Sequence, residues 1–172
     1  TELGTVYSKA ELAKLSDVCQ ANDLFLYLDG ARLGSALCSA EGDFTLADLA
    51  KLVDLFYIGG TKNGALLGEA IVINTKSLQQ EFRFHLKQRG ALLAKGRLLG
   101  IQFIELFKDD LYFDLAKHAN LMADKLRRKI KDLGYDFLAE TTSNQLFPIF
   151  PRKLIEEISS KYDFHIWSEV EE

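Results

Sequence analysis

Apolar residues recur at helical spacing near the start of the chain. Ser8 and Glu11 fit the Ser-x-x-Glu capping box of a helix start, and the apolar side chains that follow fall on one helical face, so we expect a helix over residues 9–21. Residues 24–28 are an unbroken apolar run of strand length that ends at Asp29-Gly30. A strand that is apolar on both faces is typical of a parallel sheet covered by helices.

The same cycle repeats further along the chain. Thr45 is placed to cap a short helix over residues 46–53, and residues 55–58 form a second apolar run that ends at Gly59-Gly60. A third run, 70–73, follows after an interval that has no helical period. A parallel crossover normally needs a helix in such an interval, so we expect the third strand to run antiparallel to its neighbours.

Helical periodicity dominates after residue 77. We expect helices over 77–88, 92–107 and 111–132, the last of which ends before Gly134, a residue suited to the left-handed position after a helix. The remaining predicted elements are strands over 135–139 and 145–150, a helix that begins at Pro151, and a last strand over 164–167. The helix over 111–132 is the expected junction between a sheet-bearing region (1–108) and a smaller α+β lobe (109–172).

Composition and charge narrow the possible functions. The 172 residues are 48% hydrophobic and 27% charged, which is ordinary for a globular protein. A net charge of -4 argues against nucleic acid or an anionic membrane surface as a partner. No apolar run approaches the ~20 residues that a membrane span needs. Cys19 and Cys38 have no disulfide framework, which fits a reducing cytosol, so we expect a cytoplasmic protein.

Two turns at strand ends hold the candidate chemistry. Asp29-Gly30-Ala31-Arg32 follows the first strand, and Gly59-Gly60-Thr61-Lys62-Asn63-Gly64 follows the second. In open α/β sheets, ligands bind at the carboxyl ends of strands, so both turns face one crevice if the two strands are parallel neighbours. Each turn alone is more often a plain turn, the second with a solvated lysine. Their occurrence on successive strand ends is what favours a site.

The residue types of this pair suit pyridoxal phosphate (PLP). A carboxylate at the end of an apolar strand must be paired or hydrogen-bonded, and a partly desolvated lysine amine is freed to attack a carbonyl group. The lysine amine can bind the cofactor aldehyde covalently, while the carboxylate keeps the ring nitrogen protonated. The sequence has no P-loop, dinucleotide fingerprint or serine elbow, and its three histidines (His85, His118 and His165) have no metal-ligand spacing, so we expect no metal.

Three segments around these turns resemble the threonine aldolases, PLP-dependent enzymes of the aspartate-aminotransferase-like fold (fold type I). The segments are LDGARLGSAL (28–37), FYIGGTKNGALLGEAIVI (56–73) and FRFHLKQRGALLAKGRLLGIQF (82–103). The resemblance implies an α/β fold in which residues 1–108 are part of the PLP-binding large domain. Residues 109–172 would then be part of the smaller C-terminal domain.

The resemblance also implies a role for each candidate residue. Lys62 would be the catalytic lysine that holds PLP covalently, and Asp29 would pair with the pyridine nitrogen. Arg32 would lie beside the ring, near its nitrogen or phenolic oxygen, and Thr61 would contact the phosphate. The basic residues Lys87, Arg89 and Lys95 would approach the site or a neighbouring subunit, although a solvated helix face explains them equally well.

The implied reaction is cleavage of the Cα–Cβ bond of a β-hydroxy amino acid. Threonine or allo-threonine would give glycine and acetaldehyde, and the implied assembly is a homodimer or homotetramer. Such an enzyme also needs a phosphate cup and a ring-stacking histidine well before the aspartate, and an arginine near the C-terminus that binds the substrate carboxylate. The residues before Asp29 supply neither of the first two, and Arg152 is the only arginine near the end. We therefore expect an enzyme shortened at both ends and incomplete for activity.

Two alternatives stay open at this point. The same lysine and aspartate serve other PLP enzymes of this fold, namely β-eliminating lyases and aminotransferases. The chain is also compatible with a catalytically silent fragment that acts as a folding or assembly module.

Overall fold

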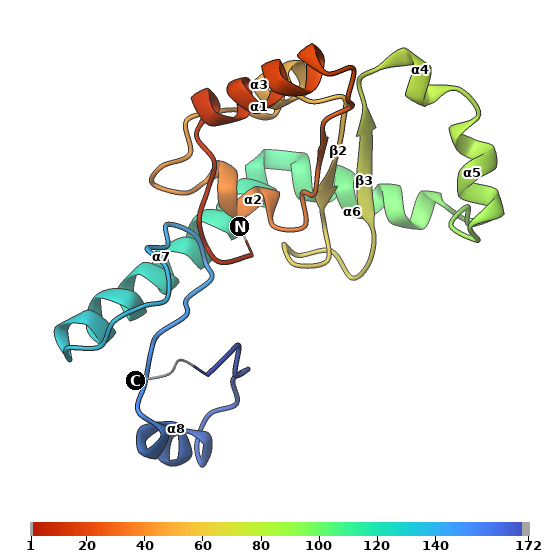
Figure 1. Cartoon of the computed structure of the whole chain (residues 1–172). Coiled ribbons are helices and arrows are strands. Elements are labelled where there is room, and N and C mark those ends of the chain that lie inside the picture. The colour runs from red at the N-terminus through yellow and green to blue at the C-terminus, as the bar shows by residue number, and fades with distance from the viewer. Residues whose placement is uncertain (1, 170–172) are drawn as a thin grey trace.

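The computed structural model describes residues 2–169, in which helices cover a small three-stranded sheet and the C-terminal helix lies away from it (Figure 1). The elements in chain order are α1 (Lys9–Ala21), β1 (Tyr27–Leu28), α2 (Leu33–Leu37), α3 (Leu46–Leu52), β2 (Leu55–Gly59), β3 (Glu69–Ile73), α4 (Lys76–Gln79), α5 (Phe82–Gln88), α6 (Arg97–Phe107), the 3-10 turn η1 (Lys108–Asp110), α7 (Leu111–Asp132) and α8 (Arg152–Ser159).

The sheet has the strand order β1-β2-β3. β1 pairs with β2 in parallel, with Tyr27 opposite Leu55 and Leu28 opposite Phe56. β2 pairs with β3 in antiparallel orientation along its whole length, down to Gly59 opposite Glu69. Both predicted orientations are confirmed, and the antiparallel third strand makes the loop over residues 60–68 a hairpin connection.

Local sequence signals set several helix ends. The Ser8 hydroxyl accepts the Glu11 N–H, and the Glu11 carboxylate accepts the Ser8 N–H at 2.8 Å, which confirms the predicted capping box. Thr45 caps α3 in the same way through Asp48. α7 ends as predicted, with Gly134 at φ +85° and its N–H donated to the Lys131 carbonyl.

The hydrophobic core lies against one face of β2. Phe56 and Ile58 point into it, and Tyr57 between them belongs to the other face. Side chains from the surrounding helices and loops complete this core, namely Leu12, Leu33, Phe44, Leu49, Val53, Leu106 and Tyr112. Burying one such large side chain stabilises a fold by roughly 1.5–3 kcal/mol, so these contacts fix the sheet relative to α1, α2, α3 and α7. The buried residues of α7 lie in its N-terminal half, and the rest of the helix extends away from the sheet (Figure 1).

Three predicted boundaries in the sheet-bearing region are wrong. β1 has only two residues instead of five, because the Leu26 N–H, which precedes it, is donated to the Asp54 carboxylate at 2.8 Å. The helix predicted over 77–88 is two helices, since Glu81 between α4 and α5 adopts a left-handed conformation with φ +57°. The helix predicted over 92–107 begins only at Arg97.

The predicted C-terminal strands are also wrong. Residues 135–139 and 145–150 meet in a single antiparallel bridge between Phe137 and Pro148, flanked by two backbone hydrogen bonds of 2.8 Å. The pairing does not extend beyond this one bridge, so neither segment forms a strand. Residues 164–167 form no strand either, and Trp167 instead packs edge-on against Phe147 with ring centroids 5.4 Å apart. The helix after Pro151 is confirmed as α8. None of the helices between residues 2 and 169 has the length and apolar character that crossing a bilayer requires.

Candidate active site

The turn of residues 29–32, called the aspartate turn below, is positioned by the register between β1 and β2. Since Leu28 pairs with Phe56, the next residues of the two parallel strands, Asp29 and Tyr57, come side by side. The Tyr57 hydroxyl donates a hydrogen bond to Asp29 Oδ1, and the Ala31 N–H donates to the same oxygen at 3.0 Å. These two bonds, with a smaller contribution from the positive charge of Lys62, hold the pKa of the Asp29 carboxyl below its usual value. Asp29 is therefore anionic at neutral pH.

Backbone atoms join the aspartate turn to the turn of residues 59–64 that contains Lys62, called the lysine turn below. The Gly59 N–H donates to the Gly30 carbonyl at 2.9 Å. A Cβ added to Gly30 would lie 1.7 Å from the Tyr57 carbonyl oxygen, and one added to Gly59 would lie 2.3 Å from that of Ala31. Only glycine allows this approach of main chain to main chain. The glycines after each predicted strand thus bring the two turns together.

Lys62 lies at the tip of a tight turn. The Asn63 N–H donates to the Gly60 carbonyl at 2.9 Å, which makes Thr61 and Lys62 the two central residues of the turn. Both central side chains are exposed. The Gly60 N–H is donated to the Glu69 carboxylate at 2.8 Å, so β3 fixes the start of the turn.

The loop after Lys62 is held by the helices behind the sheet. Gln102 of α6 accepts the Leu66 N–H at 2.7 Å and donates to the Leu67 carbonyl at 3.1 Å. Asn63 donates its side-chain amide to the Tyr112 carbonyl at 2.8 Å. These three bonds secure the loop on the C-terminal side of its tip, which leaves the lysine exposed on an anchored loop.

Tyr112 connects α7 with the start of α2 and the end of β2. Its fully buried hydroxyl accepts the Gly34 N–H and donates to the Gly59 carbonyl, each at 3.1 Å. Burial raises the pKa of Tyr112 to about 12, so the phenol is neutral and can act as a donor at physiological pH. The start of α2 and the end of β2 are therefore fixed to the same atom.

Of the other predicted residues, Arg32 lies at the aspartate turn, whereas the basic residues around α5 lie away from both turns. Arg32 is the half-buried last residue of the aspartate turn and directly precedes α2. α5, with Lys87 on it and Arg89 at its end, lies on the far side of β3 from the aspartate turn (Figure 1). The structure thus groups Asp29, Arg32, Thr61 and Lys62 on adjoining turns and leaves the basic stretch apart from them.

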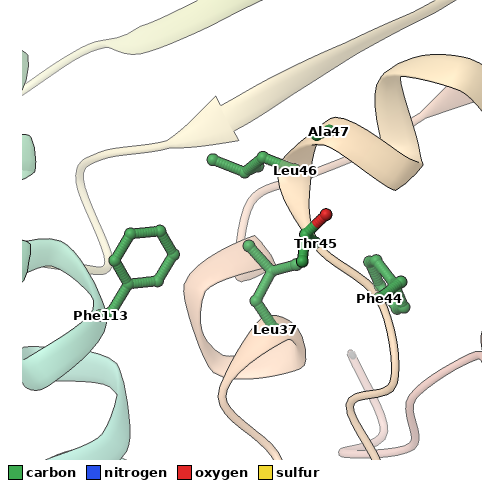
Figure 2. Close-up of a pocket in the computed structure, with 6 residues that line it drawn as sticks. All are labelled: Leu37, Phe44, Thr45, Leu46, Ala47 and Phe113. Carbon is green, nitrogen blue, oxygen red and sulfur yellow. The ribbon is translucent and has the colours of Figure 1, made fainter.

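Two apolar hollows lie among the elements of the sheet-bearing region. One of about 310 Å³ borders Asp29, Tyr27 and Tyr7, and its other lining side chains are apolar. The other, also about 310 Å³, is shown in Figure 2 and is lined by Leu37, Phe44, Thr45, Leu46, Ala47 and Phe113. It contains no charged side chain and so offers none of the chemistry of the two turns. Across residues 2–169 no group of three His, Cys, Asp or Glu side chains could hold a metal ion.

Tyr57, Tyr112 and Gln102 were not predicted as site residues. For Tyr57 a signal was available, because parallel pairing of the two apolar runs places it beside Asp29. No comparable signal existed for Tyr112 or Gln102, since their contacts with the turns span long stretches of sequence and depend on how α6 and α7 pack.

Comparison with known proteins places this site in a family. The beta-eliminating lyase family matches residues 1–150. The low specificity L-threonine aldolase of Pseudomonas aeruginosa is 34% identical over 94% of this chain and 47% of its own length. The structure of Leishmania major threonine aldolase superposes with a TM-score of 0.97 at 47% identity, over 99% of this chain and 50% of that one.

A more distant structure agrees in fold. The putative L-allo-threonine aldolase of Listeria monocytogenes is 21% identical, with a TM-score of 0.68 over 83% of this chain. The predicted α/β fold class, part of a PLP-dependent fold type I enzyme, is confirmed. The chain spans about half the length of the relatives that it matches. With a family match over most of its length, the chain belongs to the beta-eliminating lyase family, whose members depend on PLP.

Proposed function

We propose that this chain forms the lysine and aspartate part of a PLP-dependent aldehyde-lyase that cleaves threonine or allo-threonine to glycine and acetaldehyde. The observation that carries the proposal is the backbone bond between Gly59 and Gly30, which holds a turn with an exposed lysine against a turn with an anionic carboxylate. The names of the relatives from Pseudomonas aeruginosa and Leishmania major, both threonine aldolases, support the choice of substrate.

The residues present fit the cofactor. Asp29 has a lowered pKa and keeps one carboxylate oxygen open, as a partner for a protonated ring nitrogen requires. Lys62 is exposed on a turn whose neighbours are fixed, so its amine can reach an aldehyde without refolding the loop. When bound, PLP would take up the electron pair of the broken Cα–Cβ bond. In this assignment Arg32 lies beside the ring and Thr61 contacts the phosphate.

Covalent trapping tests the assignment of Lys62. Borohydride reduction of the chain with PLP should attach the cofactor to Lys62, as mapped by peptide mass spectrometry. Lys62→Ala should lose the label, whereas Lys51→Ala, which removes an exposed lysine from α3, should keep it. Labelling of another lysine in place of Lys62 would refute the site.

Product analysis separates aldolase from β-elimination, which the family description favours as the second candidate. Acetaldehyde and glycine from threonine would support the proposed lyase. Ammonia and a keto acid would support β-elimination instead. Both assays apply to the protein that carries this sequence, together with any further chain that completes it.

We further propose a division of the sequence into residues 1–108, part of the PLP-binding large domain, and 109–172, part of the small domain. Helix α7, which begins in the core and extends away from it, supports this division. A homodimer or homotetramer is the proposed assembly, with Lys87, Arg89 and Lys95 directed at a neighbouring subunit. The two cysteines, Cys19 and Cys38, are free thiols, which supports a cytoplasmic location.

A further inference from the structure

The two oxygens of the Asp29 carboxylate are used unequally. Oδ1 accepts both hydrogen bonds, one from the Tyr57 hydroxyl and one from the Ala31 N–H. Within residues 2–169, Oδ2 accepts no hydrogen bond from another protein group. The carboxylate is thus held by one oxygen and open at the other.

Both donors to Oδ1 keep their protons at neutral pH. A backbone N–H does not titrate, and burial together with the bond to Asp29 raises the pKa of the Tyr57 phenol well above its usual 10.0. Tyr57 therefore donates to Asp29 throughout the physiological range. A carboxylate held by two permanent donors on one oxygen has little freedom to rotate about its last side-chain bond.

We propose that Tyr57 is a positioning residue, which fixes Oδ1 of Asp29 so that Oδ2 is the oxygen presented to the ring nitrogen of the cofactor. The inference rests on the proposed PLP function and assigns a role to a residue on the face of β2 opposite the core. Tyr57 acts on the cofactor only through Asp29, by orienting its carboxylate and keeping it ionised.

The neighbouring strand offers a matched control. Tyr27 of β1 has its ring centroid 6.3 Å from that of Tyr57, and more than half of its surface is exposed. The hydroxyl of Tyr27 makes no hydrogen bond to Asp29 within the described residues. Tyr27→Phe and Tyr57→Phe therefore each remove one phenolic oxygen near the same carboxylate, but only the second removes a hydrogen bond to it.

The first measurement needs no cofactor. Titration of the Asp29 carboxyl carbon by NMR in the full chain should give a higher pKa in Tyr57→Phe than in the wild type, because a bond to the ionised form is lost. Tyr27→Phe should leave the Asp29 pKa close to the wild-type value. A circular dichroism spectrum of each variant checks that the fold is kept.

The second measurement is the dissociation constant of PLP. Tyr57→Phe should weaken PLP binding roughly fivefold, the size expected for losing one bond to a charged group that acts indirectly, and Tyr27→Phe should not. In a background of Asp29→Asn, which removes the anionic carboxylate, Tyr57→Phe should have no further effect. Such non-additivity would distinguish action through Asp29 from a general loosening of the sheet, which would weaken binding in either background.

The outcomes separate this inference from the proposed function. An unchanged Asp29 pKa in Tyr57→Phe, or equal effects of Tyr57→Phe and Tyr27→Phe on PLP affinity, would overturn the role of Tyr57 while Lys62 is still labelled. Additive effects of Tyr57→Phe and Asp29→Asn would overturn it as well. If borohydride never labels Lys62 in the wild type, the proposed function fails and this inference fails with it.

Discussion

The backbone N–H of Gly59 donates to the carbonyl oxygen of Gly30 over 2.9 Å, so main-chain atoms hold the turn of Asp29 against the turn of Lys62. Main-chain contacts of this kind do not depend on flexible side chains. The spacing of the two turns is therefore a property of the fold, fixed by where glycine occurs at the ends of β1 and β2.

Gly30→Ala should destabilise the protein by roughly 2–4 kcal/mol, because its Cβ would lie 1.7 Å from the Tyr57 carbonyl oxygen and the strands would have to separate. Urea denaturation would measure the change. Gly100→Ala is the control: it lies within α6 with nothing within 4 Å of the added Cβ, so it should stabilise by about 0.5–1 kcal/mol. Equal effects of the two changes would refute the close packing of the turns.

Tyr112→Phe should cost about 1–3 kcal/mol, since it leaves the Gly34 N–H and the Gly59 carbonyl buried without their partner. The same denaturation measurement applies. Tyr162→Phe removes a phenolic oxygen from a side chain that is 69% exposed and should change the free energy of unfolding very little. A Tyr112→Phe protein as stable as the wild type would show that the hydroxyl does not connect α2 with the end of β2.

Gln102→Ala should loosen the loop after Lys62, because the Leu66 N–H loses its acceptor on α6. Hydrogen exchange at the Leu66 amide should accelerate roughly five- to tenfold, the effect of one lost hydrogen bond. Glu105→Ala, an exposed change on the same helix, should leave that rate unaltered. If both variants exchange at the same rate as the wild type, Gln102 does not hold the loop.

Asp54 should make stability depend on pH in the acid range. Its carboxylate accepts hydrogen bonds from Thr75 and from the Leu26 N–H, and these lower its pKa below 3.8. The folded state therefore binds this proton more weakly than the unfolded state, so the stabilisation is complete above the ordinary pKa and is lost as the pH falls through the lowered value. Asp54→Asn should destabilise by about 1–2 kcal/mol at pH 6, the cost of weakening two partly solvated hydrogen bonds.

The wild type and Asp54→Asn should differ less in unfolding free energy at pH 3 than at pH 6. Asp17→Asn, an exposed change on α1, serves as the reference for other acid-titrating groups. A difference that stays constant between the two pH values would show that Asp54 is not the titrating group.

The apolar runs and the interval between them predicted the orientation of the strands correctly. The short interval between β2 and β3 correctly predicted an antiparallel strand, and the apolar run before Asp29 correctly predicted a parallel one. The extent of β1 was not predictable in this way, because Asp54, a side chain far along the sequence, takes the N–H that a longer strand would need. The prediction of one continuous helix over 77–88 was wrong for a local reason, the left-handed backbone conformation of Glu81.

The sequence identified two residues of the candidate site, but it did not predict the side chains that hold the two turns in place. Asp29 and Lys62 were identifiable because each follows an apolar run and has glycine beside it. Tyr112 and Gln102 were not, since their partners are backbone atoms of distant turns and any residue of the right length on the packed helix would serve. Long-range side-chain to backbone bonds leave no pattern in a single sequence.

The Tyr112 hydroxyl of α7 bonds the start of α2 and the end of β2, beside the two turns, and the Tyr112 carbonyl accepts a further hydrogen bond from Asn63. Thermodynamic linkage works in both directions, so a small molecule that stiffens the turns must also make the first part of α7 harder to unfold, and fraying of α7 must weaken the grip of the turns. The affinity of the proposed PLP site should therefore depend partly on the stability of α7.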